Sequence, residues 1–120
     1  MSRLLVHLVT GPENPTRAAL ALLVARTAMD AGHDVDMFIA GDGVANLRPE
    51  TLDAGQGIGT GSLREHVDAL VAGGVTIHAS GMSSKARGLD AAALGGLAVT
   101  MAPPARLVEL AFAADRTLTY

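Results

Sequence analysis

The regular alternation of short apolar segments with longer connections constrains the fold more than any other feature. Five segments have the composition of strands: residues 4–9, 34–40, 75–79, 97–101 and 116–119. Each connection between them is long enough for the crossover that two successive parallel strands require. The sequence therefore predicts a single α/β domain over residues 1–120, with helices packed on a parallel sheet.

Local end signals predict where two of the helices begin. Asn14 is suited to cap a helix that has Pro15 at its first position, and Gly32 follows that helix as a stop signal. Ser62 and Glu65 have the spacing of a capping box, which predicts a second helix from that point. We expect His66 to face outward from this second helix.

The remaining segments give weaker expectations. A short helix is possible near residues 44–47, and the glycine-rich stretch 55–61 is expected to be the most flexible part of the chain. Asp90 is suited to cap a short alanine-rich helix. The last helix is expected over residues 103–113, with residues 116–119 as an edge strand.

Composition excludes several classes of function. The net charge of −3 and the three aromatic residues argue against nucleic acid as a partner. The absence of cysteine excludes disulfides, thiolate nucleophiles and the carriage of persulfide. The longest stretch without an acidic or basic residue, 69–84, contains glycine, serine and histidine, so we expect no membrane span.

Functional groups in parallel sheets lie beyond the carboxyl ends of the strands. We therefore expect the candidate site at that edge of the sheet. Lys85 and Arg87 follow the third strand and could together bind an anion; alternatively they are surface charges, or pair with Asp42 or Glu13. The predicted ligand-binding residues come from three such strand ends: Gly11, Pro12, Asp42, Gly43, Ser80, Gly81, Met82, Ser83, Ser84, Lys85 and Arg87.

Catalytic signals are weak. Ser80, His78 and Glu13 are the candidates for a nucleophile and an acid or base, but the G-x-S-x-G elbow of serine hydrolases is absent. A core histidine and a loop-capping serine are the alternative interpretations, and His7 is expected to be a hydrogen-bonded core residue. The four histidines lack metal-ligand spacing, so no metal site is expected. Residues 55–61 lack the context of a phosphate-binding loop.

Three segments of the chain resemble the DsrE/DsrF-like (YchN-like) family. They read LLVHLVTGPENPTRAALALLVARTAMDAGHDVDMFIAGDGV, LREHVDALVAGGVTIHASGMSSKARGL and MAPPARLVELAFAADRTLTY. The resemblance implies a three-layer α/β/α sandwich on a mostly parallel five-stranded sheet, with strand order 4-3-2-1-5. It also implies a homotrimer or hexamer.

The same resemblance places Ser80 where sulfur-relay members carry a persulfide-accepting cysteine. A serine hydroxyl is far less acidic than a thiol and cannot hold a persulfide. Our preferred hypothesis is therefore a cytoplasmic, non-catalytic homo-oligomer that binds a small anionic ligand or a protein partner, without a cofactor. The alternatives are an enzyme that uses Ser80, His78 and Glu13, and a structural partner of a cysteine-bearing DsrE-like paralogue.

Overall fold

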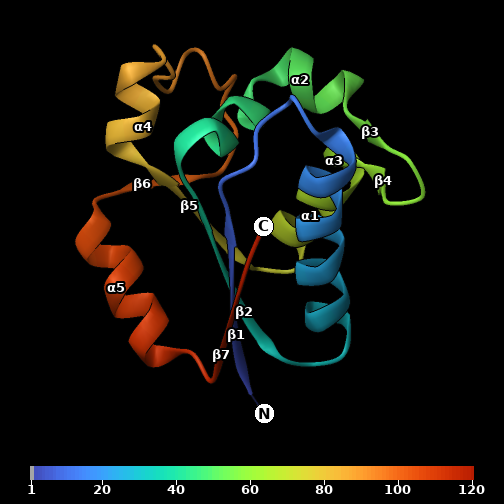
Figure 1. Cartoon of the computed structure of the whole chain (residues 1–120), viewed down its shortest axis with the longest axis vertical. Coiled ribbons are helices and arrows are strands. Elements are labelled where there is room, and N and C mark those ends of the chain that lie inside the picture. Colours follow the sequence, from blue (N-terminus) through green and yellow to red (C-terminus); the bar gives the residue numbers. More distant parts are fainter. Residues whose placement is uncertain (1) are drawn as a thin grey trace.

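The computed structural model describes residues 2–120, and it consists of a parallel sheet with helices on both faces (Figure 1). The sheet contains β1 (Arg3–Leu8), β2 (Asp34–Ile39), β5 (Thr76–Ser80), β6 (Thr100–Ala102) and β7 (Arg116–Thr119). The helices are α1 (Pro15–Asp30), α2 (Pro49–Ala54), α3 (Leu63–Ala72), α4 (Gly81–Ala86) and α5 (Pro104–Ala113), together with the 3₁₀ helix η1 (Gly41–Leu47). The strand order β6-β5-β2-β1-β7 confirms the predicted order, and every pair is parallel.

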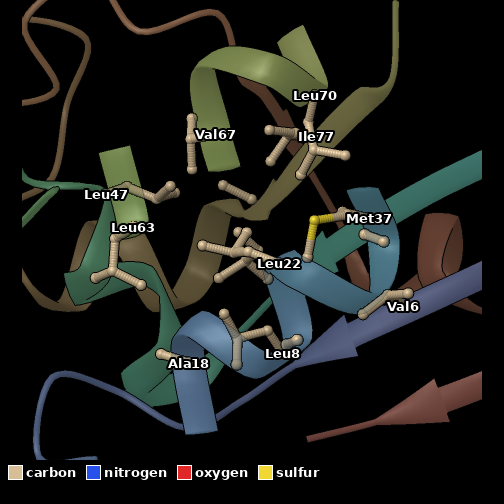
Figure 2. Close-up of a cluster of buried hydrophobic side chains, with 14 of the residues drawn as sticks. Val6, Leu8, Ala18, Leu22, Met37, Leu47, Leu63, Val67, Leu70 and Ile77 are labelled. Atoms are coloured by element: carbon tan, nitrogen blue, oxygen red, sulfur yellow. The ribbon is translucent and has the colours of Figure 1, made fainter. Parts of the chain in front are cut away.

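The two faces of the sheet carry cores of different size. On one side α1 and α3 enclose the larger core, and Figure 2 shows Leu22 of α1 lying between Met37 of β2 and Val67 of α3. On the other side α5 covers a smaller cluster, which consists of Leu5, Phe38, Ala102 and Leu110. One face of the sheet therefore depends on few apolar contacts.

The predicted helix starts are confirmed by the capping bonds. Asn14 Oδ1 accepts a hydrogen bond from the backbone N–H of Arg17 at 3.1 Å, and α1 begins at Pro15. Ser62 Oγ accepts from the N–H of Glu65 at 3.2 Å at the start of α3. These side chains satisfy backbone donors that have no partner within the helix.

The glycine-rich stretch forms a hairpin, not the flexible loop that the sequence predicted. Strands β3 (Gln56–Gly57) and β4 (Gly61–Ser62) pair antiparallel, and Thr16 of α1 bonds to this hairpin at two points. The prediction that His66 faces outward is also wrong. Its ring is buried, and Nε2 lies 2.7 Å from the carbonyl oxygen of Thr60. The hairpin is therefore held by contacts that are distant in the sequence.

Two further segments differ from the prediction. Residues 91–96 form turns, and Asp90 Oδ1 accepts a bond from the N–H of Ala93 at 2.8 Å without starting a helix. The fourth strand of the sheet, β6, begins only at Thr100, because the N–H of Val99 bonds locally to the carbonyl of Leu97 at 2.9 Å. The helix near residues 44–47 is present but longer, as η1, and α2 follows it without having been predicted.

Candidate functional site

The ends of β1 and β2 meet at the carboxyl edge of the sheet, as predicted. A Cβ atom on Gly11 would lie 2.6 Å from the carbonyl oxygen of Asp42. A Cβ atom on Gly43 would lie 2.6 Å from the carbonyl oxygen of Leu8. Only residues without a side chain allow the backbones to approach this closely. The two strand ends therefore form one packed base beside which α4 begins.

A hydrogen-bond network fixes α4 to η1. Ser83 Oγ accepts from the backbone N–H of Gly41 at 2.9 Å. Arg87 Nη2 donates to Asp42 Oδ1 at 2.8 Å, and its Nη1 donates to the carbonyl of Ser83 at 3.1 Å. Arg48 in turn donates to the carbonyl of Arg87 at 2.9 Å. Of the interpretations of Arg87 that the sequence left open, namely anion binding, a surface charge and an ion pair with Asp42 or Glu13, the geometry matches the ion pair with Asp42.

Ser80 ends β5 and caps α4. Its Oγ accepts from the N–H of Ser83 at 3.1 Å, and the residue is 7% exposed. Ser84, in the next turn, is buried as well. The role of the Ser80 hydroxyl in the structure is therefore that of a helix cap.

Neither the candidate acid nor the candidate base is hydrogen-bonded to Ser80 within residues 2–120. Both ring nitrogens of His78 are buried without a hydrogen-bond partner in residues 2–120. The Glu13 carboxylate accepts two bonds from the N–H of Gly11, at 2.7 and 2.9 Å. In the part of the chain that the structure describes, the serine–base hydrogen bond that nucleophilic catalysis needs is therefore absent.

His78 belongs to an aromatic row that crosses the sheet. In the strand register His7 is opposite Phe38, and Phe38 is opposite His78. The His7 ring meets Phe38 edge-on with centroids 6.1 Å apart, and the His78 ring stacks on Phe38 at 6.2 Å. His7 is not the hydrogen-bonded core residue that we expected, because its Nε2 is buried without a partner.

Burial lowers the pKa of both histidines. For His7, loss of hydration is the cause. For His78 burial is again the largest cause, the positive charge of Arg106 on α5 lowers the pKa further, and Asp36 partly offsets this. Burial therefore favours the neutral form of both rings. No sequence motif marks this row, because it depends on the register between three strands.

Lys85 lies apart from the Arg87 network. It lines a separate groove of about 510 Å³ between α4, the turn at residues 88–91 and β6. It makes no ion pair within residues 2–120, in contrast to Arg87. The predicted residues Gly81 and Ser84 line the same groove as Lys85.

The other predicted ligand-binding residues are dispersed. Pro12 lines a different groove, of about 350 Å³, which it shares with Pro15 and residues of α2. The Met82 side chain is mostly exposed. The single pocket expected at the sheet edge is therefore divided into a packed network and two grooves.

The structure also bears on metal binding and membrane insertion. Within residues 2–120 no cluster of histidine, aspartate and glutamate side chains is arranged to hold a metal ion. No helix in the same part of the chain combines the length and apolar character needed to cross a membrane.

Comparison with known proteins agrees with this fold. The YchN protein of E. coli matches with a TM-score of 0.82 and 18% identity, over 100% of both chains. A conserved protein of unknown function from Bacteroides thetaiotaomicron matches with a TM-score of 0.74 and 15% identity, over 99% of this chain and 95% of the other. A protein of unknown function from Methanobacterium thermoautotrophicum matches with a TM-score of 0.71 and 19% identity, over 100% of both chains.

These likenesses establish the fold, since the identities are low. A search of curated proteins finds no significant match. The sequence profile of the DsrE/DsrF-like family matches residues 3–120, nearly the whole chain. This protein, which has no cysteine, belongs to the DsrE/DsrF-like family.

Proposed function

We propose that the protein is a DsrE-like homo-oligomer that binds a small anionic ligand or a protein partner, and that it carries no persulfide. The free ammonium group of Lys85 is the observation on which this proposal rests. Arg87 is occupied by Asp42, whereas Lys85 lies beside an open groove without a carboxylate partner in the described residues. A cation in this position can bind an anion without first breaking an internal ion pair.

A serine-based enzyme has less support. Ser80 Oγ already accepts a bond from α4, and neither His78 nor Glu13 is hydrogen-bonded to it in residues 2–120. Without a base, a serine hydroxyl is a weak nucleophile at neutral pH. A binding role without catalysis is compatible with the observed positions of these side chains, whereas a serine mechanism would require them to rearrange.

Replacing Lys85 by methionine tests the binding role. Lys85→Met keeps the apolar stem and removes the charge, so affinity for acetate, sulfate or phosphate should fall about tenfold or more. NMR titration of the labelled protein with each anion measures the effect. Arg17→Met removes one charge from an exposed site on α1 and is the matched control. Equal losses in the two variants would reject Lys85 as the anion-binding group.

Self-association is supported by the surface of α5. Val108 and Phe112 lie one turn apart on this helix and are 53% and 88% exposed. Burying an exposed phenylalanine contributes about 1.5–3 kcal/mol, so a second copy placed over α5 would be stabilised. The proposal is a homotrimer or hexamer whose subunits meet along this helix.

A charge on α5 should prevent this assembly. Phe112→Lys is expected to give a monomer in size-exclusion chromatography with light scattering, because a buried unpaired ammonium opposes association. Ile58→Lys is the control, since Ile58 is 89% exposed but lies on the hairpin. An unchanged mass for Phe112→Lys would exclude α5 as the interface. A wild-type monomer would exclude the homo-oligomer itself and favour a paralogue as the partner.

A further inference from the structure

The groove beside Lys85, which we call the α4–β6 groove, is more specific than a general anion site. Building on the proposed function, we propose that it binds a small monocarboxylate with an apolar body, such as a short aliphatic acid. The carboxylate would pair with Lys85 and the hydrocarbon part would lie along the groove. This inference names the chemical class of the ligand, which the proposed function leaves open.

The shape and walls of the groove favour an apolar body. Its volume of about 510 Å³ is within the range of small-molecule sites, and its lining is mostly apolar. Leu89 forms a buried part of the wall, while Met101 is 41% exposed and offers its side chain to an incoming ligand. Gly81 and Gly88 add no side chain to the lining. An inorganic ion would leave these surfaces uncovered.

The charges of the groove favour a single negative charge on the ligand. Lys85 is the one cation among the lining residues, and Asp90 is the one anion. The Asp90 carboxylate accepts the N–H of Ala93 at 2.8 Å, which holds it at the turn. A dianion such as phosphate meets repulsion from Asp90, whereas a monocarboxylate can take the Lys85 end and leave its hydrocarbon end uncharged.

The test compares ligands of equal charge and increasing length. NMR titrations use acetate, butyrate and hexanoate, with hexanamide as the uncharged analogue and phosphate as the inorganic anion. The affinity should increase by up to about fourfold for each methylene group buried. Hexanamide should bind more weakly than hexanoate, and Lys85→Met should abolish that difference. Shift changes should include the amides of Gly81, Gly88 and Leu89.

Groove-filling variants locate the hydrocarbon part. Ala91→Trp places a large ring in the α4–β6 groove and should remove the dependence on chain length, while acetate still binds. Ala54→Trp fills the Pro12 groove and is the matched control, since both alanines are exposed and line a groove. Met101→Gln adds a polar group without enlarging the side chain, and should weaken hexanoate severalfold even if Ala91→Trp is poorly folded.

The outcomes separate this inference from the proposed function. If acetate or phosphate binds in a Lys85-dependent manner and chain length has no effect, the monocarboxylate assignment is wrong and the anion site stands. Blockage of hexanoate by Ala54→Trp alone would place the hydrocarbon part in the other groove and overturn the assignment. If none of the anions binds at millimolar concentration, the monocarboxylate assignment and the anion-binding form of the proposed function both fail.

Discussion

Lowering the pH from 7.5 to 5.5 is expected to reduce the free energy of unfolding markedly, mainly through His7 and His78. Burial lowers the pKa of both rings from the ordinary value of 6.5, so the folded protein disfavours their protonation. The unfolded chain binds these protons as the pH falls below about 6.5. Each histidine that is charged only in the unfolded state then lowers the free energy of unfolding by up to about 1.4 kcal/mol per pH unit. Above that pH the two rings are neutral in both states and contribute no pH dependence.

The surroundings of His7 and His78 explain why the folded protein does not easily accept a positive charge on either ring. The His7 Nε2 and both nitrogens of His78 have no hydrogen-bond partner in residues 2–120, so a proton would be buried without an acceptor. Arg106 on α5 opposes protonation of His78, and Asp36 compensates only partly. The Asp36 carboxylate is itself 3.7 Å from Arg3 Nη1. Acidification should therefore weaken first the small core that α5 covers.

Urea unfolding at pH 7.5, 6.5 and 5.5 measures this effect at a fixed protein concentration, because association also contributes to stability. His78→Leu puts an apolar side chain of similar size in place of the titratable ring, and should make the decline of stability with falling pH shallower. His33→Gln is the control, since His33 is exposed and lies outside this row. A His78→Leu variant with the wild-type pH dependence would refute the assignment to this row.

The fold was predictable because its signals are local. Asn14 and Pro15 specify the start of α1 within two residues, and Ser62 with Glu65 specifies the start of α3. Once four crossovers of helical length are recognised, parallel pairing follows from chain geometry. The carboxyl edge of the sheet then follows as the place where the ends of β1 and β2 meet.

The site was predictable only as a region. Lys85 and Arg87 are two residues apart, yet Arg87 turns to Asp42, 45 residues earlier, while Lys85 lines the α4–β6 groove. A short helix directs neighbouring side chains to different surroundings, and the sequence does not state which partner each will find. The burial of His66 has the same origin, since its partner Thr60 lies on a hairpin whose pairing no local signal predicted.

Replacing Gly43 by alanine is expected to cost about 1–3 kcal/mol of stability, as for other insertions into closely packed interiors. The new Cβ would lie 2.6 Å from the carbonyl oxygen of Leu8 and 3.2 Å from Ile39 Cγ2. That carbonyl cannot move freely, because it accepts the N–H of Ala40 at 3.0 Å. The backbone of η1 must therefore shift away from β1.

Gly81→Ala is the matched control for Gly43→Ala, because the same methyl group is added at the other end of the network. The Cβ at Gly81 would meet nothing closer than the carbonyl oxygen of Ala102 at 3.8 Å, so stability should change by less than about 0.5 kcal/mol. Urea unfolding of the two variants gives the comparison, and equal stabilities would contradict the close approach of β1 and η1. A shift of η1 would also displace the Gly41 N–H that holds Ser83, so the amides of α4 should exchange faster in Gly43→Ala. The groove beside Lys85 thus depends on a glycine on a different strand end, because α4 is positioned by η1.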